Sequence, residues 1–136
     1  MSGRRILVVD DEPALRKTLE RALRAVGYDV VTVGDPMLAY ELLDAGDFDL
    51  VLLDINLPQM SGDALFLAMV RRWPELAGRV ILMSGDPWAV QEGWPPDLVR
   101  CQLLTKPFTL EILNRLVAGA LAAADQAAPR RKRNGG

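Results

Sequence analysis

Three aspartates, a serine and a lysine are the residues of this chain best suited to chemistry, because each follows a short apolar run. Asp10 and Asp11 follow the first run, Asp54 the third, Ser84 the fourth and Lys106 the fifth. Clustered carboxylates supply the hard oxygen ligands that Mg²⁺ prefers, and one carboxylate can also act as a nucleophile. A lysine ammonium and a hydroxyl can bind the oxygens of an arriving phosphoryl group, whose transfer depends mainly on positioning and charge neutralisation. The set therefore predicts magnesium-dependent phosphoryl transfer.

The elements that must bring these residues together alternate between strand and helix. Apolar runs predict strands over 6–9, 30–33, 48–55, 80–83 and 101–104, and apolar residues at helical spacing predict helices over 14–26, 36–46, 63–73 and 110–121. Asp35 and Thr109 are predicted to begin the second and the last of these helices. Such alternation implies a parallel sheet covered on both faces, because right-handed crossovers place each helix over the sheet. Ligands bind outside the carboxyl ends of such strands, where all the candidate residues stand.

Composition excludes several other functions. The 136 residues are 50% hydrophobic and 25% charged, as in a soluble domain, and include no histidine and one cysteine. Imidazole-dependent catalysis and an internal disulfide are therefore excluded. The formal net charge of -2 lacks the positive excess that binding a phosphate backbone requires, and no apolar run approaches a membrane span. We expect a cytoplasmic protein without nucleic-acid or membrane partners, with a folded domain over 1–124 and a disordered basic tail over 125–136.

Four short segments resemble the signatures of response-regulator receiver domains of two-component signalling. They are VVDDEP at 8–13, LDINLP at 53–58, MSG at 83–85 and TKPF at 105–108, in the order and spacing of that family. The resemblance spans roughly 4–122, which is nearly the whole chain. It implies a flavodoxin-like, doubly wound α/β fold, similar to the chemotaxis receiver, with five parallel strands in the order 2-1-3-4-5 and helices on both faces.

The same resemblance implies a role for each candidate residue. Asp54 would be the phosphoacceptor, and the Mg²⁺ ligands would be Asp10, Asp11, Asp54 and the backbone carbonyl of Asn56. Ser84 and Lys106 would contact the phosphoryl group.

Further positions of the family pattern concern regulation. Asn56 and Asp86 stand where the family tunes the lifetime of the phosphoryl group, and the peptide between Lys106 and Pro107 is expected to be cis. Leu103 stands where the family often carries a tyrosine or phenylalanine that acts as a switch.

The segment between Ser84 and Lys106 departs from the family pattern. Its prolines and Gly93 leave room for only a turn or two of the family's fourth helix, which we expect to be short or irregular. Trp88 and Trp94 in this segment are interpreted as loop residues, with a partner surface as the alternative. With the missing aromatic at Leu103, this predicts an altered output face and a monomer or weak dimer.

These observations favour a receiver that takes a phosphoryl group onto Asp54 from a histidine kinase or a histidine phosphotransfer protein. It would signal through an unidentified protein partner and would be no enzyme beyond its own phosphorylation and dephosphorylation. One alternative is a degenerate receiver that acts as a constitutive interaction module. A second is a magnesium-dependent phosphohydrolase with an aspartate nucleophile, although such enzymes place Asp-x-Asp after the first strand and add a substrate cap. Whether the chain is a stand-alone regulator or a receiver of a hybrid kinase stays open.

Overall fold

The computed structural model describes residues 3–60, 62–86, 96 and 101–127. Strands and helices alternate along them as far as β4. The bounds are β1 Arg5–Val9, α1 Pro13–Val26, β2 Asp29–Val33, α2 Pro36–Ala45, β3 Leu50–Asp54, α3 Gly62–Arg72, η1 Pro74–Gly78, β4 Val80–Ser84, β5 Gln102–Thr105 and α5 Leu110–Ala127. The strands form one parallel sheet in the order β2-β1-β3-β4-β5. The predicted doubly wound α/β fold and its strand order are therefore confirmed.

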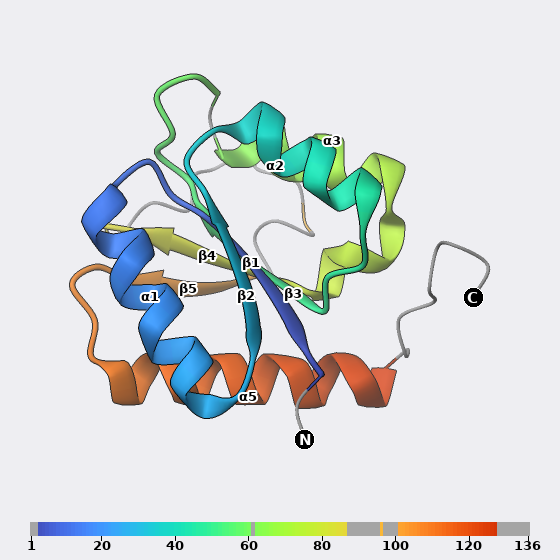
Figure 1. The fold of residues 1–136 in the computed structure, drawn as a ribbon. Helices are drawn as coiled ribbons and strands as arrows, with labels where there is room; N and C mark the ends of the chain where they lie inside the picture. Colours follow the sequence, from blue (N-terminus) through green and yellow to red (C-terminus); the bar gives the residue numbers. More distant parts are fainter. Residues whose placement is uncertain (1–2, 61, 87–95, 97–100, 128–136) are drawn as a thin grey trace.

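The sheet separates two layers of apolar core. Because successive side chains of a strand point to opposite faces, Leu7 and Val9 of β1 pack in the cluster that includes α2 and α3, whereas Ile6 and Val8 pack in the cluster that includes α1 and α5. Figure 1 shows the two pairs of helices on opposite sides of the sheet. β3 and β4 are buried at every residue, which explains why their sequences are continuous apolar runs.

Local signals fix the ends of the helices that flank the site. Pro13 opens α1, where a missing N–H costs nothing, and Gly27 ends it in the left-handed region at φ 115°. The Asp35 carboxylate accepts a backbone N–H from the first turn of α2, and the Thr109 hydroxyl accepts one from the first turn of α5. Both predicted helix starts are confirmed.

The C-terminal end of α5 differs from the prediction. The helix continues to Ala127, three residues past the predicted end of the domain at 124. Asp125 on its last turn pairs with Arg4 at the start of β1 and lies 3.9 Å from the buried guanidinium of Arg79. These ion pairs hold the last turn against the sheet. The predicted irregular fourth helix, the segment with Trp88 and Trp94, and the basic tail beyond residue 127 lie outside the described residues.

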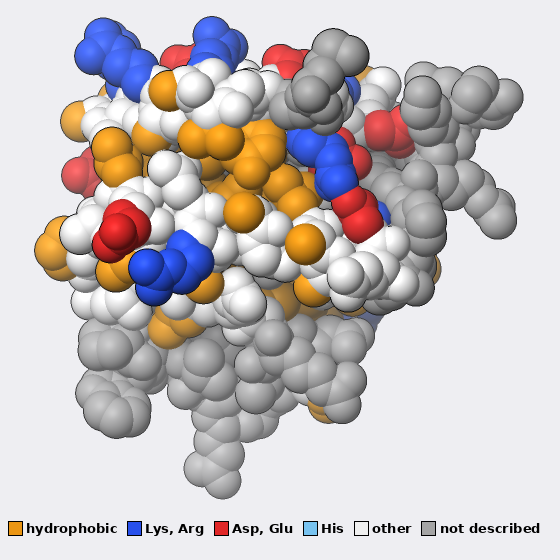
Figure 2. All heavy atoms as spheres, turned by 90° about the horizontal axis from the view of Figure 1, so that it is seen from below, with side chains coloured by type: hydrophobic (Ala, Val, Ile, Leu, Met, Phe, Trp, Pro, Cys, Tyr) orange, Lys and Arg blue, Asp and Glu red, His pale blue; other side chains and the backbone are white. Residues whose placement is uncertain are grey.

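Apolar side chains are exposed on the face formed by α1 and α5. Figure 2, which views this side, shows apolar side chains gathered across its middle. The exposed large apolar residues of these two helices are Val26, Leu110 and Ile112. A groove of about 450 Å³ lies between the first turns of α1 and the loop before α5, and the Lys106 side chain helps to line it. None of the described helices is long and apolar enough to cross a membrane.

Candidate functional site

Asp54 is the last residue of β3, the central strand of the sheet. Its neighbours in the strand are buried apolar residues, and its own exposure is only 3%. One carboxylate oxygen, Oδ1, accepts the backbone N–H of Asn56 at 2.9 Å, and Oδ2 lies 3.5 Å from Nζ of Lys106. The carboxylate therefore lies at the carboxyl edge of the sheet, fixed on one side and in looser contact on the other.

Asp10 follows the neighbouring strand, β1, and is fully buried. Its Oδ1 accepts the backbone N–H of Glu12 at 2.9 Å, and its Oδ2 lies 2.8 Å from Nζ of Lys106. Its backbone N–H donates to the carbonyl of Val33 at the end of β2. Asp10 is therefore held by its own turn, by the adjacent strand and by the lysine.

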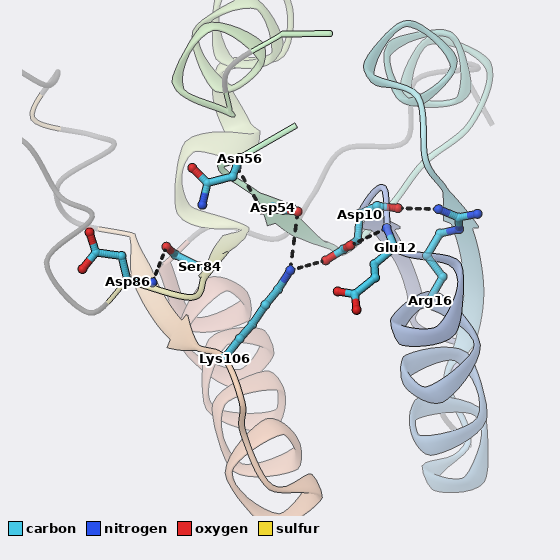
Figure 3. Close-up of polar contacts among 8 residues, drawn as sticks. All are labelled: Asp10, Glu12, Arg16, Asp54, Asn56, Ser84, Asp86 and Lys106. Atoms are coloured by element: carbon cyan, nitrogen blue, oxygen red, sulfur yellow. Dashed lines mark hydrogen bonds and ion pairs between the residues drawn. The ribbon is translucent and has the colours of Figure 1, made fainter. Parts of the chain in front are cut away.

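Lys106 lies on the loop after β5 and reaches across β4 and β3 to these carboxylates, as Figure 3 shows. Its backbone N–H donates to the carbonyl of Ser84 at 2.7 Å, which fixes the start of the loop against the end of β4. The side chain is 22% exposed. The peptide bond between Lys106 and Pro107 is cis, the conformation that the resemblance implied.

Ser84 ends β4 beside Asp54 and is fully buried. Its Oγ accepts the backbone N–H of Asp86 at 3.0 Å, so the hydroxyl hydrogen remains to be donated elsewhere. The exposed Asp86 carboxylate points away from Asp54 and Lys106 in Figure 3.

The three strand ends share one local turn. In each, the side-chain oxygen of the last polar residue accepts the backbone N–H two residues later, for Asp10, Asp54 and Ser84 alike. Short side chains that carry an oxygen atom commonly form such turns. The side-chain oxygens of these three residues are therefore all held at the same edge of the sheet.

Burial and charge act in opposite directions on the two central groups. Burial raises the pKa of Asp54, and the Asp10 carboxylate adds to that effect, while the Asn56 amide and the Lys106 charge offset only part of it. Burial alone would lower the pKa of Lys106, but its hydrogen bond to Asp10 and the charges of Asp10 and Asp54 raise that pKa overall. Lys106 is therefore a cation at neutral pH.

The carboxylates of Asp10, Asp11 and Asp54 form a donor set suited to a hard cation. Oxygens of the three lie within 4.8 Å of one another, with Asp11 exposed and the other two buried. Mg²⁺ binds oxygen ligands at about 2.0–2.1 Å and usually keeps several waters, so these three carboxylates would hold the ion together with water. Their negative charge exceeds what Lys106 alone offsets. The residues present therefore fit Mg²⁺.

The structure thus brings Asp10, Asp11, Asp54 and Lys106 together, with Ser84 on the next strand. The Asn56 side chain is exposed, and its backbone contributes the N–H to Asp54. Leu103 lies on β5, partly buried against the core beneath α2 and α3, away from the cluster.

One contact of the site was not predicted from the sequence. Arg16, on the first turns of α1, donates from Nη1 to the backbone carbonyl of Asp10 at 2.6 Å. Its place six residues after Asp10, on the helix that begins with Pro13, is the only sequence signal for it.

Comparison with known proteins identifies the group to which this arrangement is similar. The family model described as response regulator receiver domain matches residues 6–118. The transcriptional regulatory protein TcrA of Mycobacterium tuberculosis is 37% identical over 116 residues, which cover 83% of this chain and 44% of TcrA. The chain therefore spans less than half the length of this curated relative.

Solved structures show the same fold. The signal receiver domain of an HD domain-containing protein from Pseudomonas fluorescens superposes with a TM-score of 0.79 at 26% identity, covering 96% of each chain. The response regulator TrrA of Thermotoga maritima, in complex with Mg²⁺ and BeF, superposes with a TM-score of 0.71 at 25% identity, covering 86% of this chain and 98% of TrrA.

Proposed function

Because the chain belongs to the response regulator receiver domain family, we propose that it is a phosphoacceptor that takes a phosphoryl group onto Asp54. The observation that carries the proposal is the convergence of the Lys106 ammonium with the carboxylates of Asp10, Asp11 and Asp54 at one edge of the sheet. The donor would be a phosphohistidine of a histidine kinase or of a histidine phosphotransfer protein.

Asp54 is the proposed nucleophile. One of its carboxylate oxygens forms the new O–P bond while the P–N bond to the donor imidazole breaks, and the imidazole leaves with the bonding electron pair and takes up a proton. The raised pKa of Asp54 makes this carboxylate a stronger base than an exposed aspartate, and the Lys106 charge beside it favours the ionised form.

Lys106 and Ser84 are proposed to bind the transferred group. The ammonium lies 3.5 Å from Oδ2 of Asp54, so it is placed to donate to a phosphoryl oxygen carried by that carboxylate. The Ser84 hydroxyl, whose oxygen already accepts the Asp86 amide, has its hydrogen for a second phosphoryl oxygen.

We propose that Asp10, Asp11 and Asp54, with the Asn56 backbone carbonyl, hold Mg²⁺. When bound, the ion would neutralise charge that develops on the phosphoryl oxygens. The Mg²⁺ and BeF complex of TrrA supports this proposal for a protein of the same fold. Asn56 and Asp86 are proposed to affect the lifetime of the phosphoryl group.

We further propose that phosphorylation alters the affinity of this receiver for a protein partner and that the receiver performs no separate enzymatic turnover. The described receiver extends to the end of α5 at Ala127. The relatives include the transcriptional regulatory protein TcrA, so the expectation of no nucleic-acid partner is proposed for this receiver only. A cytoplasmic location and a monomer or weak dimer complete the proposal.

The test is intact-mass measurement after incubation with acetyl phosphate and Mg²⁺. We expect one phosphoryl adduct, which is lost in Asp54→Asn and without Mg²⁺ and is retained in Asp44→Asn, whose exposed carboxylate lies on α2. Beryllium fluoride titration of the same proteins detects binding even if the acyl phosphate hydrolyses quickly. Failure of both measurements would leave the constitutive interaction module as the better description, whereas turnover of phosphate esters would indicate a phosphohydrolase.

A further inference from the structure

Arg16 connects the first turns of α1 to the end of β1. Its Nη1 donates to the carbonyl of Asp10 at 2.6 Å, a contact drawn in Figure 3. The other polar atoms of Asp10 bind the amide of Glu12, the ammonium of Lys106 and the carbonyl of Val33. Arg16 therefore completes the set of contacts that fixes Asp10, and it acts on the backbone, away from the two carboxylate oxygens.

Gly34, which follows β2, leaves the space that this guanidinium occupies. A Cβ at position 34 would lie 2.5 Å from Nη1 of Arg16 and 3.2 Å from its Cζ, with the Asp10 carbonyl oxygen at 3.5 Å. Gly34 is not among the glycines with positive φ, so its backbone is one that alanine adopts. A side chain at position 34 would therefore displace the end of the flexible arginine, and the glycine leaves the guanidinium its room without any special backbone conformation.

We propose that Arg16 and Gly34 together form a positioning device for magnesium binding, in which the guanidinium holds the backbone of Asp10 so that its carboxylate faces Asp11 and Asp54. Arg16 is a positioning residue here, since it contacts the peptide of a ligand and not the ion. The inference rests on the magnesium site of the proposed function. Partners that orient metal ligands typically contribute about 10- to 100-fold to metal affinity.

Charge and position predict opposite effects for this arginine. A cation near the site repels Mg²⁺, so its removal would tighten binding if charge were its only influence. If position dominates, removal weakens binding because Asp10 loses one of its restraints. Gly34→Ala separates the two effects, since it keeps the positive charge of Arg16 but pushes the guanidinium away from the Asp10 carbonyl.

The experiment is a Mg²⁺ titration of the ¹⁵N-labelled protein, followed by the amide shifts of Glu12 and Asn56, whose N–H groups bind the carboxylates of Asp10 and Asp54. We expect the dissociation constant to rise about tenfold in Arg16→Met. We expect a similar rise of the dissociation constant in Gly34→Ala. The rise in Arg16→Lys should be smaller, because lysine keeps a hydrogen-bond donor on a shorter side chain.

The combination of the two changes gives the sharpest comparison. In the Arg16→Ala background the added methyl at position 34 meets no guanidinium, so Gly34→Ala should cause no further loss of Mg²⁺ affinity. Arg21→Met, which removes an exposed arginine from the same helix, serves as the matched control and should bind Mg²⁺ as the wild type does. Thermal unfolding of each variant shows that the titrated protein is folded.

Two results would overturn this inference and leave the magnesium site intact. The first is wild-type Mg²⁺ affinity in a folded Arg16→Met protein. The second is tighter Mg²⁺ binding in Arg16→Met with unchanged binding in Gly34→Ala, which would show that the charge of Arg16 matters and its position does not. Additive losses from the two changes would also contradict the shared device. Absence of Mg²⁺ binding in the wild type would instead overturn the proposed magnesium site, and this inference with it.

Discussion

Replacement of Lys106 by methionine should destabilise the protein in a manner that depends on pH. Methionine keeps most of the aliphatic stem but removes the ammonium that lies 2.8 Å from Asp10 and 3.5 Å from Asp54. Asp10 is fully buried and Asp54 is 3% exposed, so two carboxylates would be left close together without a compensating charge.

The expected loss of unfolding free energy is about 2 kcal/mol at pH 7. Removal of one partner from a buried ion pair costs about 3–5 kcal/mol. Because Lys106 is 22% exposed, and because a proton taken up by Asp54 would relieve part of the repulsion, we expect a loss somewhat below that range. With a urea m-value of about 1.5 kcal/mol/M, the denaturation midpoint would fall by a little over 1 M.

The pH dependence follows from the directions of the two pKa shifts. The raised pKa of Lys106 means that its contribution is fully present below the unfolded value of 10.5 and is lost as the pH rises through the higher folded value. At the acidic end Asp54 becomes protonated, and the lysine loses that charged partner. The difference between wild type and Lys106→Met should therefore shrink as the pH falls through the raised pKa of Asp54, and again as the pH rises above 10.5 through the raised pKa of Lys106.

Urea denaturation followed by far-UV circular dichroism, without Mg²⁺, measures this effect. Asp54→Asn in the Lys106→Met background removes one of the crowded charges and should recover more than half of the loss, and saturating Mg²⁺ should do the same. Equal midpoints for wild type and Lys106→Met at pH 7 would refute the reasoning, because the lysine would then not be offsetting the buried carboxylates.

Three further outcomes follow from the structure. Asp54→Asn should raise the urea midpoint at pH 7, because a folded-state pKa raised above 3.8 means that ionisation of this carboxyl disfavours folding as the pH rises. The gain in midpoint should vanish near pH 4. A lower midpoint than the wild type at pH 7 would contradict this prediction. Gly27→Ala should cost about 1–2 kcal/mol, since φ is 115° there, and an unchanged thermal midpoint would count against the strain. Asp125→Asn should lower the free energy of unfolding by about 0.5–1 kcal/mol at low salt, because it weakens the ion pairs with Arg4 and Arg79. If this loss did not depend on ionic strength, the ion pairs would not be its cause.

The fold could be predicted because its central strands are buried on both faces. Leu50 to Leu53 are all apolar, as expected for a strand in a parallel sheet between two helical layers. The site followed from the same fact, since parallel strands end at one edge and Asp10 and Asp54 are the polar residues that end two neighbours.

The features that the sequence did not reveal depend on contacts between distant parts of the chain. Arg4 and Asp125 are 121 positions apart, so nothing local indicates that α5 extends far enough for its last turn to pair with the first strand. The space that Gly34 leaves for Arg16 likewise depends on how the residue after β2 packs against the first turn of α1. A glycine after a strand is common in turns, and its steric role appears only when the neighbouring side chain is placed.

The contacts of Asp10 hold its carboxylate in place, whereas those of Asp54 leave its carboxylate freer to move. Asp10 is held by β2, by α1, by its own turn and by the loop after β5, so a shift of its carboxylate would break contacts to several elements at once. Asp54 has one firm contact, to the Asn56 amide at 2.9 Å, and a long one to Lys106 at 3.5 Å. Rigidity suits Asp10, which is proposed only as a metal ligand, whereas Asp54 is also the proposed nucleophile and must change its bonding and its charge. The oxygen with the looser contact, Oδ2 of Asp54, is therefore the atom that we expect to attack.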